Sequence, residues 1–204
     1  MSGSLRAGSS NSAVLDAARL LAPSGVVVAP YTGLRALPAF DPDLDTPDGT
    51  ALPPEVRRFR DQVGRADAVL ISSPEYAHGI AGALKNALDW LVGSTEFSGR
   101  VVALLSTSTR AVHAPAQLIE VVTTMNAWLV PEACVTVPLH GRALDGPAIA
   151  AGPKPRGPGP HRDRRTRSSG RSDGRTRRRL NTTRMRPENS GTGPEPECRS
   201  RSQC

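Results

Sequence analysis

The chain has 204 residues and a formal net charge of +7 that is unevenly distributed. Residues 1–145 carry 11 basic and 14 acidic side chains, whereas residues 146–204 carry 15 and 5, so a mildly acidic segment long enough for one core precedes a strongly basic one. The three scattered cysteines do not form a disulfide framework or a zinc site. No run approaches the roughly 18 apolar residues of a membrane span, and no signal peptide opens the chain. We therefore expect a cytoplasmic protein.

The first third of the chain predicts two helices with one strand between them. Capping residues at 9–11 precede apolar residues at helical spacing, and the helix ends before residue 23. The β-branched run 26–29 predicts a short strand. Residues 30–52 hold several prolines and aspartates and predict a loop. A second helix is expected over residues 54–64, with proline at its first turn.

Strands and helices then alternate more regularly. The apolar runs 68–72 and 101–106 predict strands that are covered on both faces. Helices are expected over residues 81–91 and 115–128, and a last strand over residues 134–137. Strands that alternate with helices of this length are typical of βαβ units, so we expect an α/β fold with a parallel sheet and helices on both faces.

Both ends of the chain depart from this pattern. The chain opens on a Gly/Ser turn with no strand before it, so we expect that the first strand of such a sheet is missing. Residues 146–204 are rich in Arg, Pro and Gly and nearly devoid of apolar side chains, which predicts a disordered basic tail. A reading-frame shift in a GC-rich gene would produce this abrupt tail, and a start codon assigned too late would remove the strand; both are hypotheses.

Residues 3–11 have the composition of a phosphate-binding loop. Glycine and serine let backbone N–H groups converge, and the following helix adds the partial positive charge of its N-terminus. Arg6 adds a full charge, while Ser4, Ser9 and Asn11 offer polar side chains. By itself the pattern is also typical of a flexible leader.

A second loop follows the strand at residues 68–72. It is punctuated by proline and glycine, carries Tyr76, and leads into the helix expected over residues 81–91. In open α/β sheets, ligands bind in the crevice outside the carboxyl ends of the strands. In the strand order 2-1-3-4-5 the two loops are neighbours, so a phosphorylated, flat heterocycle would span them.

Residues 3–11, 74–79 and 82–90 resemble the NADPH-dependent FMN reductase family, and the resemblance covers about residues 2–142. It implies a flavodoxin-like fold and an oxidoreductase in which hydride passes from NADPH or NADH through FMN to a small acceptor such as a quinone or flavin. It also implies a homodimer or homotetramer. For the FMN phosphate it implies Ser4, Arg6, Ser9 and Asn11; for the isoalloxazine ring it implies Pro74, Glu75, Tyr76, His78 and Gly79, with the loop after Ser106 nearby.

Two departures from the family pattern stand out. The family usually has asparagine where this chain has Ala77, and it is glycine-rich where this chain has residues 107–113. This chemistry needs no catalytic acid or nucleophile, so we assign no catalytic side chain and expect Tyr76 to shape the ring face.

Two other readings of the chain remain open. One is a truncated, inactive flavoprotein-like chain, because the absence of the first strand would leave sheet backbone unpaired. The other is nucleic-acid binding through the arginines of residues 162–186, although this tail has no aromatic side chains on which bases would stack.

Several side chains outside the two loops have ordinary structural interpretations. Lys85 and Asp89 are spaced to form a surface ion pair. Trp90 and Trp128 are expected in core or interface packing, and Cys134 as a buried thiol. We expect no metal site, because His113 and His140 have no partner at ligand spacing, and we expect His78 to contribute backbone contacts.

Overall fold

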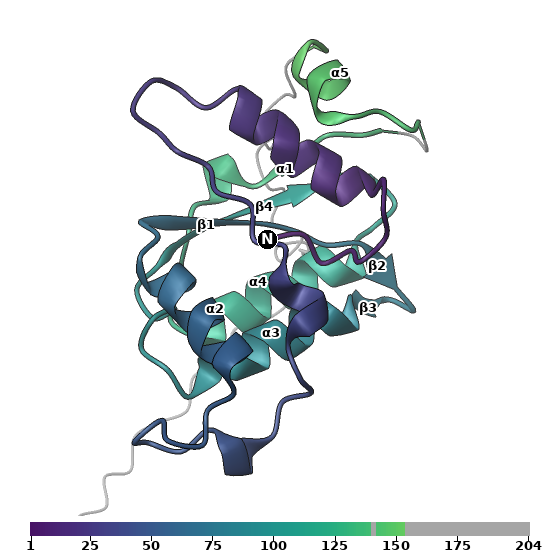
Figure 1. Cartoon of the computed structure of the whole chain (residues 1–204). Helices are drawn as coiled ribbons and strands as arrows, with labels where there is room; N and C mark the ends of the chain where they lie inside the picture. The colour runs from purple at the N-terminus through teal and green to yellow at the C-terminus, as the bar shows by residue number, and fades with distance from the viewer. Residues whose placement is uncertain (140–141, 154–204) are drawn as a thin grey trace, which may run out of the picture. The chain divides into compact units, whose positions relative to one another are not determined.

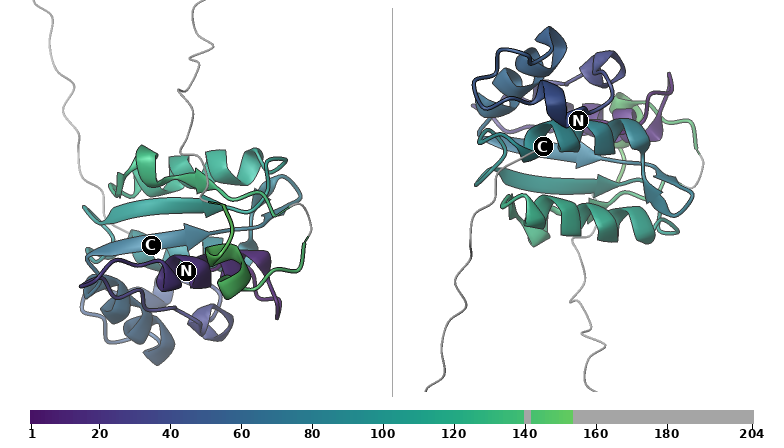
Figure 2. Two further views of the ribbon diagram at one scale, coloured as in Figure 1. Left: turned by 90° about the horizontal axis from the view of Figure 1, so that it is seen from above. Right: turned by 90° about the horizontal axis from the view of Figure 1, so that it is seen from below.

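A computed structural model describes residues 1–139 and 142–153 of the chain. Its centre is a parallel sheet in which β1 (Ala68–Ser72) pairs with β4 (Val101–Ser106) along its full length, from Ala68 opposite Val101 to Ser72 opposite Leu105. On its other side β4 pairs with two short parallel strands, β5 (Trp128–Leu129) near its start and β6 (Val135–Thr136) at its carboxyl end. The strands run side by side in Figure 2, and the expected parallel α/β sheet is confirmed.

Helices cover both faces of this sheet (Figure 1). One face carries α1 (Ser10–Leu20) and α5 (Gly146–Ala150); the other carries α2 (Pro54–Gly64), α3 (Gly82–Val92) and α4 (His113–Thr124). The hairpin of β2 (Glu75–Tyr76) and β3 (Gly79–Ile80) forms a separate antiparallel pair just after β1. Single 3-10 turns complete the fold: η1 (Gly33–Ala36), η2 (Pro42–Leu44) and η3 (Pro131–Ala133).

Residues 1–3 lie beside the carboxyl end of β1. The Ser72 amide donates to the Met1 carbonyl at 3.0 Å, and the Gly3 amide donates to the Ser72 carbonyl at 2.8 Å. Ser2 and Ser72 therefore form a parallel bridge at the sheet position that the first strand of a flavodoxin order would take. Among the described residues, this edge of β1 is paired only at its carboxyl end.

The strand expected over residues 26–29 does not form, so this prediction was wrong. The segment is a loop, and the Val27 side chain is 90% exposed. In a sheet with the strand order 2-1-3, the second strand pairs only with the first strand. In this chain residues 1–3 occupy the position of the first strand, and they extend along only the carboxyl end of β1. Among the described residues, the β-branched run therefore has no neighbouring strand to complete its backbone hydrogen bonds.

Two expectations near the end of the sheet also need correction. The helix predicted over residues 115–128 begins at His113 and ends at Thr124, because Asn126 turns into the left-handed region with φ of 58°. Trp128 is therefore in the edge strand β5, where it is 71% exposed, so packing in the core is wrong for this residue and packing at an interface stays a prediction. Cys134 is half-buried rather than buried, and its thiol donates to the Val130 carbonyl.

The core lies between the sheet and the helices α2, α3 and α4. Trp90 of α3 is fully buried, as expected; its ring meets that of Phe40 edge to face at 5.0 Å, and its indole N–H donates to the Pro38 carbonyl. On the exposed side of α3, Lys85 and Asp89 form the predicted ion pair. Leu84, Leu88 and Leu91 of the same helix are also buried.

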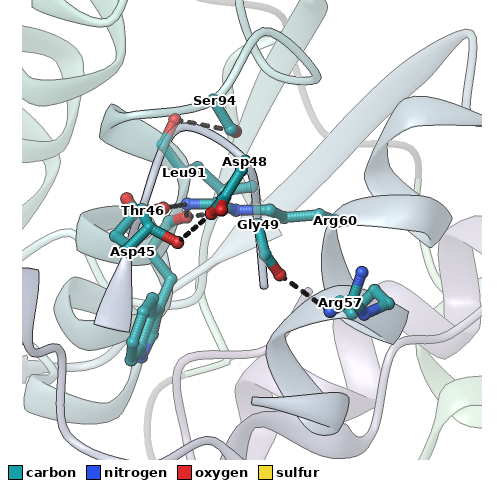
Figure 3. Close-up of polar contacts among 9 residues, drawn as sticks. Asp45, Thr46, Asp48, Gly49, Arg57, Arg60, Leu91 and Ser94 are labelled. Carbon is teal, nitrogen blue, oxygen red and sulfur yellow. Dashed lines mark hydrogen bonds and ion pairs between the residues drawn. The ribbon is translucent and has the colours of Figure 1, made fainter. Parts of the chain in front are cut away.

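A buried ion pair fixes the long loop between η1 and α2 (Figure 3). The Arg60 guanidinium of α2 donates to the Asp45 carboxylate at 2.8 Å and to the Trp90 carbonyl, and both charged side chains are about nine-tenths buried. Arg57 donates to the Gly49 carbonyl at 2.9 Å. Because this loop has no regular strand or helix of its own beyond η2, these polar contacts hold it against α2 and α3.

The helix α5 packs against α1 (Figure 1). The Asp145 carboxylate caps it by accepting from the Ala148 amide at 2.9 Å. This helix falls at the start of the segment 146–204 that we expected to be disordered; residues 154–204 lie outside the described part of the chain. Within the described residues, no helix is long and apolar enough to cross a membrane.

Candidate functional site

The loops that follow residues 1–3, β1 and β4 surround one pocket of about 410 Å³. The pocket lies at the carboxyl ends of β1 and β4, which is the position of ligand crevices in open α/β sheets. Its volume falls in the range of small-molecule sites, roughly 300–1,000 Å³. It is lined by Ser4, Arg6, Gly8, Ser9, Ser10, Asn11, Ser73, Pro74, Glu75, Tyr76, Ser106, Thr107, Ser108, Arg110 and Ala111.

The first loop delivers the N-terminus of α1 to the pocket. Ser9 is the N-cap, and its hydroxyl accepts from the Asn11 amide at 3.2 Å. Gly8 has a φ of 66°, a conformation that glycine adopts without the steric cost of a side chain. The exposed Arg6 stands beside this helix start, so the loop presents one full and one partial positive charge. Arg35 of η1 fixes the loop from outside by donating to the Leu5 carbonyl.

A buried hydrogen bond joins this loop to the sheet. The Ser72 hydroxyl donates to the Asn11 side-chain carbonyl at 2.8 Å, and both residues are buried. Gly3 passes so close to the second loop that an added Cβ would lie 3.0 Å from the Ser73 hydroxyl. Asn11 therefore aligns α1 with the end of β1, a structural role that the sequence did not show.

The second loop is the β2–β3 hairpin, and it presents Tyr76 to the pocket. Its two-residue turn consists of Ala77 and His78, which both have positive φ, 49° and 59°. Positive φ at both central residues is typical of a type I′ turn, which favours asparagine at the first position. Tyr76 is 56% exposed, so most of its ring is open to a ligand.

Glu75 joins the hairpin to the third loop. Its carboxylate accepts from the amides of His113 at 2.8 Å and Ala114 at 2.9 Å, and so caps α4, whose own N-cap residue Val112 makes no side-chain hydrogen bond to it. The hydrogen bond from the Ala114 amide, followed by that from His113 and the nearby imidazoles, holds the pKa of Glu75 below its usual value. Glu75, which the resemblance implies for the isoalloxazine ring, therefore also caps a helix.

The third loop adds a second arginine to the pocket. Ser106 ends β4, and its hydroxyl donates to the Ser108 carbonyl at 3.1 Å. The Ser108 hydroxyl accepts from the Arg110 amide. Sequence reasoning did not select Arg110, although the departure of residues 107–113 from a glycine-rich pattern, directly after a predicted strand, was a signal for it.

The structure brings eight of the ten residues predicted from the sequence around this pocket. His78 and Gly79 do not line it; they lie at the turn and in β3, where the His78 carbonyl accepts from the Gln117 side chain at 3.0 Å. The ring of His78 instead stacks on that of His113, so His113 has a histidine neighbour that sequence spacing did not reveal. His140 lies outside the described residues.

The family model of the NADPH-dependent FMN reductases matches residues 1–141, which include all three loops of the pocket. The chain belongs to this family. The match confirms the resemblance drawn from residues 3–11 and 74–90, and with it the flavodoxin-like fold class.

Individual relatives agree with this assignment. The chain is 42% identical over 110 residues to an NAD(P)H-dependent FMN reductase of Pseudomonas aeruginosa, covering 53% of this chain and 57% of that protein. It is 37% identical over 89 residues to a quinone reductase of Escherichia coli, covering 44% and 46%. The flavoenzyme FerB of Paracoccus denitrificans, an NAD(P)H:(acceptor) oxidoreductase, superposes with a TM-score of 0.56 at 29% identity, covering 64% and 72%. The chain spans about half the length of the curated relatives it matches.

Proposed function

We propose that this chain binds FMN in the pocket between the three loops and acts as an NAD(P)H-dependent oxidoreductase. The proposal rests on one observation, which is that a surface suited to a phosphate and a surface suited to a flat ring line the same pocket. The start of α1, with Arg6, suits a phosphate, and the segment from Pro74 to Tyr76 suits a flat ring.

The residues of the pocket fit the two ends of FMN. At the phosphate end, the hydroxyl of Ser4, the guanidinium of Arg6 and the N-terminal amides of α1 are donors or positive charges. Asn11 uses its side-chain carbonyl to accept from Ser72, which leaves its amide group as a donor. At the ring end, Tyr76 supplies an exposed aromatic side chain.

Bound FMN would supply the chemistry of accepting and donating hydride, and the protein would position it. Tyr76 shapes one wall of the ring site. Glu75 holds this wall against the third loop, because its carboxylate accepts two hydrogen bonds from amides at the start of α4. Arg110 adds positive charge at the rim, which favours anionic groups of the nicotinamide cofactor or of the acceptor.

The acceptor class and the biological setting are parts of the same proposal. Relatives named as quinone reductases support a quinone or a similar small molecule as electron acceptor. The family resemblance supports a homodimer or homotetramer and a cytoplasmic location.

The test combines flavin binding with turnover. The purified chain is mixed with FMN, desalted and examined by absorbance, and NADPH oxidation is then followed with and without a quinone. We expect retained flavin and quinone-dependent NADPH oxidation. Arg6→Ala should weaken FMN binding about tenfold, the usual effect of losing a charge-assisted hydrogen bond to phosphate. Arg142→Ala, an exposed arginine outside the pocket, serves as the matched control.

Two results would count against the proposal in different ways. Loss of all flavin on desalting would contradict FMN binding by this chain and favour the reading of a chain inactive as written. Retained flavin that is equally tight in Arg6→Ala and Arg142→Ala would contradict the assignment of the phosphate end.

A further inference from the structure

A cluster of three metal-ligating side chains lies at the edge of the hairpin. Glu75 of β2, His78 of the turn and His113 at the start of α4 each offer one ligand atom, and these atoms all lie within 4.8 Å of one another. The three residues come from two loops that are far apart in the sequence. Neither histidine lines the pocket described above, and Glu75 is the one member of the cluster that does.

Backbone contacts hold the cluster together. The His113 amide donates to the Glu75 carboxylate at 2.8 Å, which brings the start of α4 against β2. The Gln117 side chain of α4 donates to the His78 carbonyl at 3.0 Å. Both strands of the hairpin, β2 and β3, also pack against α4. The imidazole rings consequently stack at a centroid distance of 4.2 Å and 12° between planes.

We propose that Glu75, His78 and His113 form a binding site for a divalent transition-metal ion of the Zn²⁺ class. Two imidazoles with one carboxylate are a donor set that zinc takes in proteins, and the same set suits other borderline divalent metals.

The geometry shows what binding requires. A metal ion lies in the plane of each imidazole that binds it, and two parallel stacked rings do not share a plane. Both histidines are exposed, so one ring is free to rotate about its side-chain bonds without displacing core residues. One Glu75 oxygen accepts both α4 amides, which leaves the other oxygen for the metal. Water completes the coordination, so the site is open.

Calorimetric titration of the full chain with Zn²⁺, without FMN, tests this proposal independently of the proposed function. The cysteines are first alkylated so that thiolates do not compete. We expect one site that weakens about tenfold or more in His78→Ala and in His113→Ala, as is usual when a metal site loses a supporting group. Binding should also weaken in acid, because imidazole ligands must be deprotonated.

Matched variants separate ligand loss from unfolding. Glu120→Gln removes an exposed carboxylate of α4 that is not part of the cluster and should leave Zn²⁺ binding unchanged. Glu75→Gln keeps a carbonyl oxygen that accepts the α4 amides but removes the charge, and should weaken binding while the circular dichroism spectrum is retained. Absence of Zn²⁺ binding, or equal affinity in the parent chain, His78→Ala and His113→Ala, would overturn the site.

Discussion

Glu75 shows how one side chain organises the pocket. It stands in the hairpin, yet its two hydrogen bonds go to the first amides of α4, which lacks a cap of its own. An anionic acceptor at a helix N-terminus is favoured by both the free amides and the helix dipole. Glu75 therefore joins the second and third loops, which contribute Tyr76 and Arg110 to the same pocket.

The hydrogen bonds to Glu75 predict a pH dependence. Because its pKa is lower in the folded chain than the usual 4.5, the carboxylate stabilises the fold above that value, and this contribution is lost as the pH falls through the lowered pKa. Amide hydrogen exchange should show the start of α4 better protected in the parent chain than in Glu75→Gln at neutral pH. The difference should vanish in acid. A difference that persists in acid would contradict the role of the charge.

A second residue-scale prediction concerns the buried ion pair of Asp45 and Arg60. Asp45→Ala leaves the Arg60 charge buried beside the Trp90 carbonyl, and should lower the free energy of unfolding by about 3 kcal/mol. Glu55→Ala breaks the exposed pair with Arg58 and should cost about 0.5 kcal/mol. Urea unfolding measures both. Equal losses would show that burial does not decide the strength of these pairs.

At the scale of elements, the hairpin turn explains a departure of this chain from its family. The family usually has asparagine at position 77, and here Ala77 adopts a φ of 49°. The left-handed region costs an ordinary side chain about 1–2 kcal/mol, and asparagine tolerates it better. The family's asparagine therefore suits the turn itself, whether or not its side chain contacts a ligand.

This explanation predicts the effect of restoring the family residue. Ala77→Asn should raise the free energy of unfolding by about 1 kcal/mol, because it relieves the positive φ. Ala77→Val should lower it, since β-branched side chains fit this region worst. The midpoints of urea unfolding compare the two variants. A loss of stability in Ala77→Asn would show that the turn is not the reason for the family residue.

The elements also show which features of the fold are readable from sequence. α1, α2, α3, β1 and β4 lie within a residue or two of their predicted bounds, because their apolar spacing, caps and prolines are local signals. Residues 26–29 carry an equally local strand signal, but no strand in the described part of the chain lies beside them. The helix expected to reach Trp128 stops earlier, because Asn126 takes a left-handed conformation that no periodicity encodes.

The candidate site shows the same difference between features with a local sequence signal and features that depend on tertiary contacts. The sequence predicted the first two loops from composition and from the resemblance, and the parallel sheet then brings them together at one edge. The sequence did not predict the contacts between distant segments, which are Asn11 with Ser72, Glu75 with the start of α4, and the stacked rings of His78 and His113. These depend on the packing of complete elements, so no spacing within the sequence reports them.

In the whole molecule, three loops at the carboxyl edge of the sheet build one pocket. Residues 1–3 pair with the carboxyl end of β1 and lead directly into the first loop, so this edge of the sheet positions that loop. Flavin binding therefore tests the fold and the site together, since the phosphate end and the ring end come from different loops.

The most direct measurement is the absorbance spectrum, from the near ultraviolet through the visible, of the purified chain after FMN is added and free flavin is removed. We expect a protein-bound flavin spectrum that NADPH bleaches, with weaker flavin retention in Arg6→Ala and Tyr76→Ala than in Arg142→Ala. A folded chain that retains no flavin would contradict FMN binding in this pocket, because all three loops would then be in place without forming the site.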